Sequence, residues 1–257
     1  MRHSNNTGIS YTSGIADFVS NYDLNNTPQE VIRRAKLLFL DSFGCGLYGA
    51  RLDWTRKIIS TLIKVDQSTS CCLMGGSEKL GPLHVSLING SQIQGFELDD
   101  VHRKAVLHVG AVTLPPLLAL SELDIQITGK DFLRAAIAGY EIGPRVGLCM
   151  GQEHIGQGWH SGATVGVFSA VSGAANILRL TPDETIHAIG IAGTQSSGLM
   201  AAQFGSMVKR MHAGKSAHSG LLAALLAKEK FTGIVDVFEA PYGGFCSTFS
   251  RSSDRFD

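Results

Sequence analysis

The sequence predicts a mainly α-helical protein built as a bundle of packed helices. Three segments carry a helix start signal, in which a threonine cap residue is followed three positions later by an acidic residue; they begin at Thr27, Thr128 and Thr181. Apolar residues recur at helical spacing after each signal. Only residues 70–74 read as a strand. Because no linker, charge run or internal repeat divides the 257 residues, we expect a single helical domain over 1–257.

Helices are expected, in chain order, at 15–22, 28–39, 54–64, 80–95, 111–123, 129–140, 160–178, 182–191 and 216–228. The segment 160–178 is almost wholly apolar or small, but serine and asparagine residues interrupt it. Its apolar length therefore falls short of the roughly 20 residues that span a bilayer. Small residues recur every four positions within it, at Gly162, Gly166, Ala170 and Ala174. This spacing places them on one stripe, so we expect a buried central helix that another helix approaches closely.

Composition and charge restrict the class of partner. Lys plus Arg equal Asp plus Glu at 22 each, so the formal net charge is zero and no basic face for nucleic acid or anionic lipid is indicated. The polar N-terminal residues are not followed by an apolar run of signal-peptide length, which favours an intracellular location, in the cytoplasm or an organelle matrix. We expect a small-molecule partner, no nucleic acid and no membrane.

The cysteines indicate neither a metal site nor a cluster. Their number is five, an odd number, and their spacing includes no C-x-x-C motif; they are Cys45, Cys71, Cys72, Cys149 and Cys246. We expect packing residues or inert surface thiols. The chemistry of the protein is therefore expected to use neither a cysteine-bound zinc ion nor an iron–sulfur cluster.

Three short segments concentrate polar and ionisable residues. Residues 95–108 hold three carboxylates and two histidines, namely Glu97, Asp99, Asp100, His102 and His108. Residues 158–162 place His160 at the head of the small-residue helix, and residues 207–214 contain Lys209, Arg210 and His212. Together these segments supply acids, possible bases and cations, which suits the binding of a polyanionic small molecule and proton transfer to or from it.

Each of these residues also has a structural interpretation. His108 can be a hydrogen-bonded core histidine, His160 a helix cap, and the pair Asp99 and Asp100 first-turn acids stabilised by a helix dipole. Lys209 and Arg210 can form a solvated surface pair. His102 and His212 are expected to support other residues more than to react. We treat the remaining histidines as structural: His3, His84, His154, His187 and His218.

The order of these motifs carries a family resemblance. The segments F-E-L-D-D-V-H-R-K-A-V-L-H, G-W-H-S-G-A-T-V-G, L-R-L-T-P-D-E, G-L-M-A-A-Q-F-G-S-M-V-K-R-M-H-A-G and Y-G-G-F resemble the MmgE/PrpD family over about residues 15–245. That family includes enzymes like 2-methylcitrate dehydratase and the cis-aconitate decarboxylases. The resemblance implies a helical N-terminal domain, often dimeric, followed by an α/β lid domain, with the active site between them. The lid is absent from this sequence, so we expect a chain truncated before it and a site that forms an open groove.

The resemblance also implies roles for individual residues. His108 falls on the family's histidine after the D-D motif, His160 on the histidine that opens the small-residue helix, and Lys209 on the lysine of the K-R-x-H element. Glu97 lies near a position that is Asp in some decarboxylases, and Val101 stands where others have a hydroxyl residue. We assign catalysis to His108, His160, Lys209 and Asp100. We assign substrate binding to Glu97, Asp99, His102, Arg210 and His212.

The resemblance implies a cofactor-independent lyase that acts on a citrate- or aconitate-like polycarboxylate. Dehydration of 2-methylcitrate or another alkylcitrate ranks slightly above the alternative, decarboxylation of cis-aconitate to itaconate. Both reactions need near-neutral histidines and a fixed cation, so they share one site design. An alternative of another class is a catalytically silent, truncated paralogue that acts as a dimerisation module. We expect a homodimer, and we expect the heads of His108, His160 and Lys209 to lie within roughly 12 Å of one another, the span of a citrate plus its hydrogen bonds.

Overall fold

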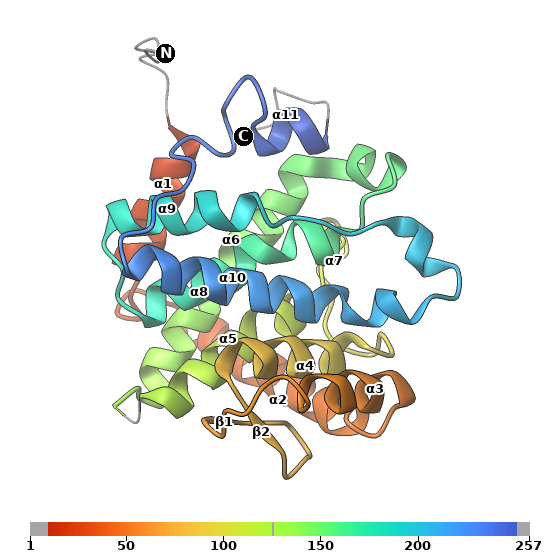
Figure 1. The fold of residues 1–257 in the computed structure, drawn as a ribbon. Coiled ribbons are helices and arrows are strands. Elements are labelled where there is room, and N and C mark those ends of the chain that lie inside the picture. The colour runs from red at the N-terminus through yellow and green to blue at the C-terminus, as the bar shows by residue number, and fades with distance from the viewer. Residues whose placement is uncertain (1–9, 125, 251–257) are drawn as a thin grey trace.

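The computed structural model describes residues 10–124 and 126–250, and almost all of its regular structure is helical (Figure 1). The α-helices within this part of the chain are α1 Tyr11–Asn21, α2 Gln29–Gly49, α3 Asp53–Leu62, α4 Pro82–Gln94, α5 Val109–Leu123, α6 Gly129–Gly156, α7 Ser161–Thr164, α8 Gly166–Ile177, α9 Pro182–Gly193, α10 His212–Lys228 and α11 Phe245–Phe249. Two 3₁₀ helices, η1 Met200–Gln203 and η2 Met207–Met211, lie between α9 and α10. The predicted fold class is confirmed.

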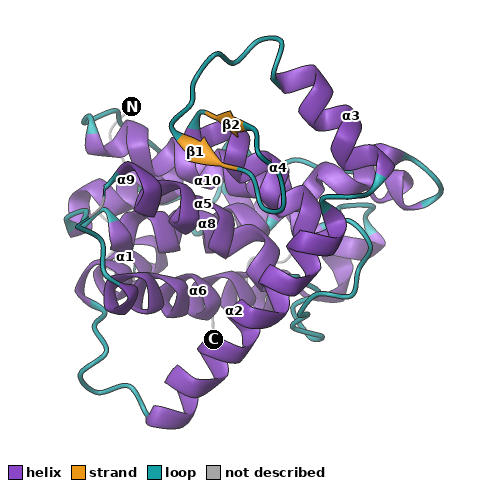
Figure 2. Cartoon of the chain, turned by 90° about the horizontal axis from the view of Figure 1, so that it is seen from below, coloured by secondary structure: helices purple, strands orange, loops and turns teal. Residues whose placement is uncertain are grey.

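A small antiparallel hairpin is the one sheet among the described residues (Figure 2). It pairs β1 Cys71–Cys72 with β2 Lys79–Leu80, so that Cys71 lies opposite Leu80. The sequence predicts the first strand but not the second, whose two residues carry too little pattern to be recognised. As a consequence α4 begins at Pro82, two residues later than expected, with the proline at its first turn.

The helix start signals act as expected at two of the three positions. Thr128 and Thr181 each form a capping box, with Asp131 and Glu184 respectively. The expectation for Thr27 is wrong. Its hydroxyl donates to the carbonyl oxygen of Asp23 and contacts the Tyr22 hydroxyl at 2.9 Å, so it stabilises the preceding turn, and α2 begins after Pro28 without a side-chain cap.

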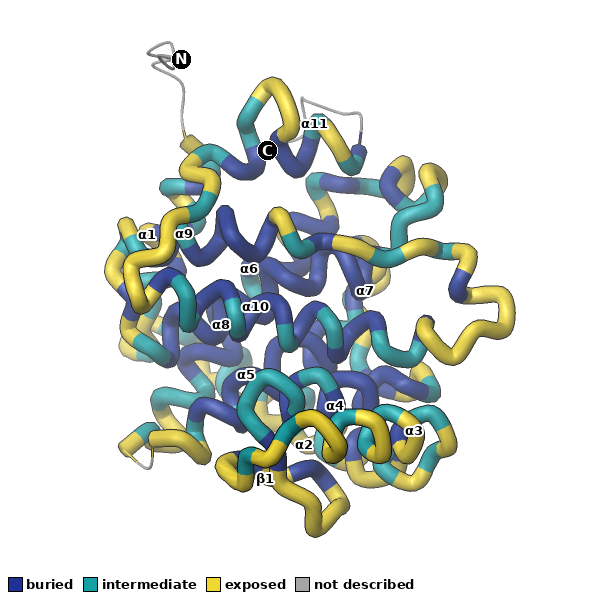
Figure 3. Tube along the Cα trace, in the orientation of Figure 1, coloured by how far each residue is buried: buried dark blue, intermediate teal, exposed yellow. Residues whose placement is uncertain are grey.

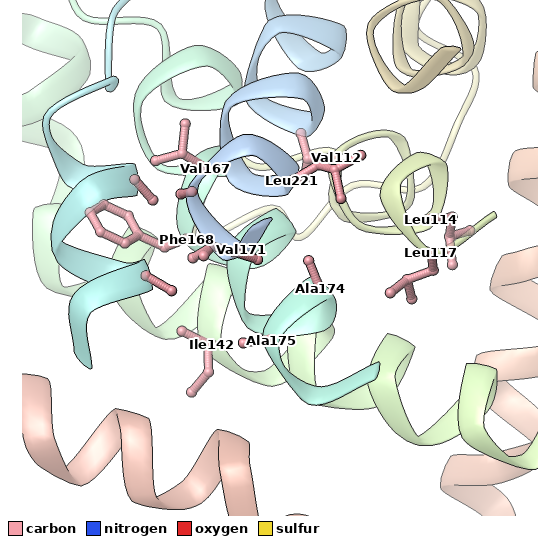
Figure 4. Close-up of a cluster of buried hydrophobic side chains, with 14 of the residues drawn as sticks. Val112, Leu114, Leu117, Ile142, Val167, Phe168, Val171, Ala174, Ala175 and Leu221 are labelled. Carbon is pink, nitrogen blue, oxygen red and sulfur yellow. The ribbon is translucent and has the colours of Figure 1, made fainter. Parts of the chain in front are cut away.

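Helix α8 lies at the centre of the molecule, with all twelve of its residues buried (Figure 3). The helix predicted at 160–178 is divided in two, because α7 ends at Thr164 and α8 begins at Gly166. Helix α8 packs against α5, α6, α9 and α10. Phe168 and Val171 of α8 lie in one apolar cluster with Val112 and Leu117 of α5 and Leu221 of α10, and none of the five has exposed surface (Figure 4).

The small residues of α8 permit the close helix crossing that their spacing predicts. A Cβ atom built on Gly220 of α10 would lie 2.4 Å from the Cβ of Ala170 and 2.6 Å from the backbone nitrogen of Val171. A Cβ atom built on Gly166 would lie 2.8 Å from a methyl carbon of Val112. Real atoms do not approach so closely, so the glycines set the distance between these helices.

In the part of the chain that the structure describes, no helix is both long enough and apolar enough to cross a membrane. The segment between α9 and α10 extends away from the helical body and is largely exposed (Figure 3). It contains η1 and η2. This segment brings Lys209 and Arg210 toward the loop that joins α4 to α5, where Glu97 lies.

Candidate functional site

The loop 95–108 ends where α5 begins, and Asp100 fixes that junction. The backbone N–H of Gly110 donates to both carboxylate oxygens of Asp100, at 3.1 and 3.3 Å, and the hydroxyls of Ser42 and Tyr140 lie 3.3 and 3.5 Å from Oδ1. A Cβ atom at position 110 would lie 2.1 Å from the Ser42 Oγ, so only glycine fits there. Asp100 therefore holds the first turn of α5 from outside the helix.

Burial controls the protonation of Asp100. Removal from water, together with the neighbouring Asp99, raises the pKa of this carboxyl to about 6. The same burial and the Asp100 charge raise the pKa of Tyr140 well above its usual value, so that its hydroxyl remains a donor. The arrangement is a half-buried acid whose side chain is supported by two hydroxyls and contacts the helix start, while the His108 ring hydrogen-bonds the Asp100 backbone.

Asp99 contacts His108, which is the N-cap residue of α5. The His108 Nδ1 lies 3.1 Å from the Asp99 Oδ1, and the Asp99 side chain is fully buried. Burial lowers the pKa of His108, but the hydrogen bond to Asp99 and its charge outweigh this and raise the pKa above the usual value. A proton on Nδ1 is held by Asp99. The two adjacent aspartates thus have different partners.

His160 and His212 form the second part of the site. Their ring centroids lie 4.8 Å apart, and the backbone N–H of His160 donates to the carbonyl of Gly198. Burial and the neighbouring His212 and His108 lower the pKa of His160 to about 4, so this imidazole is neutral near pH 7. Burial also lowers the pKa of His212, with Lys209 adding to the effect. The Nδ1 atoms of both rings are buried and have no hydrogen-bond partner.

Lys209, in η2, is a buried cation with 4% of its surface exposed. Its ammonium group is ion-paired with Glu97, whose carboxylate also accepts from Arg210 at 3.1 Å. Burial and the adjacent Arg210 lower the pKa of Lys209 to about 8, while the contact with Glu97 favours the charged form. Glu97 has a φ of 61°, a left-handed conformation uncommon for a residue other than glycine. The loop 95–108 and η2 are therefore tied together at this carboxylate.

The predicted residues divide into connected contacts and one exception. The structure links Asp99 to His108, His160 to His212, and Lys209 and Arg210 to Glu97, and the charges of these groups influence one another. His102 lies within its own loop, where Nδ1 accepts from the backbone N–H of Ala105. We call the connected residues the polar edge; it comprises Glu97, Asp99, Asp100, His108, His160, Lys209, Arg210 and His212. The 12 Å span and the open groove stay predictions.

Several supporting residues have no signal in the sequence. Ser42 and Tyr140 lie far from Asp100 along the chain, within α2 and α6, so only the fold brings them to it. Trp54, whose ring lies 5.4 Å from the guanidinium of Arg210, was not foreseen either. Gly110 does carry a signal in the sequence, because a glycine next to a helix start permits close approach of another chain segment.

The remaining histidines were expected to be structural. His154 is fully buried and bonded through both ring nitrogens, to the Phe249 carbonyl at 3.0 Å and to the Thr164 hydroxyl at 2.6 Å. His84 pairs with Asp66 at 2.6 Å, and His187 contacts the backbone of Gly233. Burial lowers the pKa of His218 to about 4. His3 lies outside the described residues.

No group of three or more histidine, cysteine, aspartate or glutamate side chains within residues 10–124 and 126–250 is arranged to hold a metal ion. The carboxylates and imidazoles of the polar edge instead contact one another and two cations, Lys209 and Arg210. Such a set of cations and imidazoles suits the carboxylate groups of a small acid.

The chain is a nearly all-helical domain with a polar edge of histidines, acids and a buried lysine. Comparison with known protein families identifies the family that has this kind of domain. Residues 13–256 match the MmgE/PrpD N-terminal domain. The chain belongs to this family.

Three relatives carry names that refer to cis-aconitate decarboxylase. The chain is 39% identical over 249 residues to a cis-aconitate decarboxylase of Aspergillus terreus, and 39% identical over 251 residues to a cis-aconitate decarboxylase-like protein of Aspergillus oryzae. It is 28% identical over 250 residues to the human cis-aconitate decarboxylase. These alignments cover 94–95% of the chain but 51–52% of each relative. The chain therefore spans about half the length of these relatives.

Proposed function

We propose that this chain is the helical half of a cofactor-independent lyase that acts on a citrate- or aconitate-like tricarboxylate, and that the reaction is decarboxylation of cis-aconitate to itaconate. The family and the relatives named as cis-aconitate decarboxylases support this proposal. The sequence ranks dehydration of 2-methylcitrate or an alkylcitrate slightly higher, but these relatives reverse the order. Dehydration is therefore the reaction against which the proposal is tested.

One observation carries the proposal: buried polar atoms without partners lie beside a buried lysine. In the part of the chain that is described, Asp99 Oδ2, His160 Nδ1 and His212 Nδ1 have no hydrogen-bond partner. Each such atom costs about 1–3 kcal/mol. A polar ligand that bonds these atoms would offset the cost. A polycarboxylate suits the two imidazoles, which can donate an N–H to it, and Lys209, whose charge acts on His212, supplies positive charge together with Arg210.

The protonation states give each residue a task. In decarboxylation the bond between carbon and the departing carboxylate breaks, carbon dioxide leaves, and the electron pair retained on carbon takes up a proton. His108 is the proton donor in our proposal, because its pKa is raised and Asp99 holds it in place. His160, neutral near pH 7, hydrogen-bonds the substrate, and Lys209 with Arg210 holds the surviving carboxylates. Asp100 positions His108 through the first turn of α5.

A homodimer of single helical domains is the second part of the proposal. An apolar stripe on α2 supports it, because Leu37, Leu40 and Tyr48 expose 50%, 68% and 57% of their surface. A catalytically silent dimerisation module would use the same stripe. A dimeric mass by light scattering that becomes monomeric in Leu40→Glu supports the assembly, and a monomeric native chain contradicts it.

The reaction is tested by product mass. The protein, expressed from the complete reading frame that contains this chain, is incubated with cis-aconitate or with 2-methylcitrate after treatment with a chelator. We expect loss of carbon dioxide from cis-aconitate, unaffected by the chelator. Loss of water from 2-methylcitrate alone would assign dehydration, and restoration of activity by added iron or zinc would contradict the metal-free proposal. No turnover of either acid would favour the silent module.

A further inference from the structure

Two cysteines from distant parts of the chain lie in contact away from the polar edge. The sulfur atoms of Cys149, in α6, and Cys246, in α11, are 3.7 Å apart and 97 residues apart in sequence. Cys246 is 2% exposed, whereas Cys149 is half-buried. The remaining cysteines belong to other elements, so this pair is a contact between two helices and not a motif in the sequence.

The distance between the sulfurs is short enough for a covalent bond after a small shift. A disulfide has a sulfur–sulfur length of about 2.05 Å, so the atoms must approach by roughly 1.7 Å. Helix α11 has only five residues and follows a turn in which Tyr242 is 96% exposed and Gly243 has a φ of 72°. A displacement of α11 by this amount therefore moves a short element and leaves α6 in place.

We propose that Cys149 and Cys246 form a redox modification site, at which a peroxide oxidises the two thiols to an intramolecular disulfide. The Cys149 sulfur attacks one oxygen of the peroxide as a thiolate, the oxygen–oxygen bond breaks, and a sulfenic acid and hydroxide form. The Cys246 sulfur then attacks the Cys149 sulfur, the sulfur–oxygen bond breaks, and water leaves with the Cys246 proton. In total, two thiols and hydrogen peroxide give one disulfide and two waters.

The environment determines which sulfur reacts first. The contact with Cys149 and burial raise the pKa of the Cys246 thiol, so it is the poorer thiolate, and it is also inaccessible. Cys149 meets the peroxide, and Cys246 resolves the sulfenic acid from the adjacent position. The order of the two steps follows from exposure and geometry together.

The disulfide would also affect the polar edge, a consequence that rests on the proposed function. The Phe249 carbonyl of α11 accepts from His154 Nδ1, so His154 Nε2 accepts from the Thr164 hydroxyl. Thr164 is the last residue of α7, the helix that His160 caps. The rings of Trp159 and Phe249 lie 4.8 Å apart, next to His160. Covalent attachment of α11 to α6 therefore fixes the elements that hold His160.

Thiol counting and peptide mass test the disulfide independently of any activity. After exposure to hydrogen peroxide and alkylation under denaturing conditions, we expect two of the five thiols to be protected, and a tryptic species that joins the Cys149 and Cys246 peptides. Reduction should restore all five. The cross-linked chain should unfold several degrees higher, because a long closed loop restricts the unfolded chain.

Single substitutions separate the two sulfurs. In Cys246→Ser, Cys149 should accumulate as a sulfenic acid trapped by dimedone, and in Cys149→Ser no cross-link and no trapped Cys246 should appear. Cys72→Ser, which removes an exposed thiol elsewhere, should cross-link as the native chain does. The inference is overturned if native Cys149 and Cys246 remain alkylatable, or if Cys149 proceeds to sulfinic acid while Cys246 stays reduced. Neither result would bear on the lyase assignment.

Discussion

The central helices and the polar edge differ in the kind of buried polar group that each leaves without a hydrogen-bond partner. Around α8, Thr113 lies 2.7 Å from Ser169, which also donates to the Gly139 carbonyl, whereas the buried hydroxyls of Ser172 and Ser219 have no hydrogen-bond partner. At the polar edge, Asp99, His160 and His212 keep buried polar atoms without partners, and Lys209 is buried with its charge. The central helices therefore leave isolated neutral hydroxyls unpaired, whereas the polar edge leaves ionisable groups unpaired next to a buried cation.

This contrast teaches where stability and function are separated in the molecule. Small residues let the central helices approach until backbone atoms touch, so that region tolerates little change of volume. The polar edge is built on element ends, namely the N-termini of α5 and α7 and the 3₁₀ helix η2. Rigid helices position it while its side chains retain unsatisfied bonding capacity.

The largest effect should come from the histidine paired with a buried aspartate at the polar edge. We expect His108→Ala to lower kcat by about 10²–10⁴-fold with little change in KM, because it removes the proposed proton donor. His84→Ala is the matched control, since His84 also pairs with an aspartate, Asp66, but lies outside the polar edge. Steady-state kinetics on cis-aconitate measure both. Equal losses of kcat in His108→Ala and His84→Ala would show that the histidine–aspartate pair of the polar edge has no special role in turnover.

A second comparison concerns how the free energy of unfolding depends on pH. The pKa of Asp100 is raised from 3.8 to about 6, so the folded state binds an extra proton between these values and its unfolding free energy falls as pH rises through this window. Asp100→Asn should remove this loss, on the order of 2–3 kcal/mol between about pH 4 and pH 6. Urea unfolding at several pH values gives the difference curve.

The contribution of Asp66 to the free energy of unfolding should change with pH in the opposite direction to that of Asp100. Burial opposes ionisation of Asp66, but hydrogen bonds from the backbone of Ser68 and Gly81 and from His84 lower its pKa overall. Its contribution to stability is therefore present above the unfolded pKa and lost as pH falls. Asp66→Asn should remove a stabilisation at neutral pH, whereas Asp100→Asn should not, and the same sign in both variants would refute this electrostatic account.

The sequence predicts most of the helices because apolar spacing and caps are local signals. Thr128 and Thr181 carry capping boxes that the structure confirms, while Thr27 has the same pattern but bonds to the preceding turn. The polar residues of the three motif segments are also visible in sequence. Their pairing is not, because Ser42, Tyr140 and Trp54 reach the polar edge only through the fold, and neighbouring Asp99 and Asp100 look equivalent until their partners are known.

The buried lysine should affect binding more than turnover. We expect Lys209→Ala to raise KM by roughly 10–100-fold, the loss of one charged hydrogen bond to a carboxylate, with a smaller change in kcat. Lys228→Ala, which removes an exposed lysine from the end of α10, should leave both constants unchanged. A kcat loss in Lys209→Ala with unchanged KM would assign this lysine to the chemical step instead.

The smallest effect should be a stability change at the central helices. Gly220→Ala places a Cβ against the backbone of α8, and we expect a net loss of about 1–2 kcal/mol after the gain in helix propensity. Gly14→Ala in α1 meets no atom within 4 Å and should instead stabilise by about 0.5–1 kcal/mol. Urea midpoints distinguish them. A stabilised Gly220→Ala chain would show that the helices can separate freely.

The central claim is that three distant segments form one carboxylate site at the polar edge, and imidazole NMR with a tricarboxylate ligand tests it most directly. The ring nitrogen signals of the histidines are assigned by substitution and followed during titration with tricarballylate, a substrate-like acid that cannot react. We predict that His108, His160 and His212 shift together with one dissociation constant, which weakens in Lys209→Ala, while His84 and His187 do not move. Independent shifts with different constants, or shifts confined to His84 and His187, would contradict a single site.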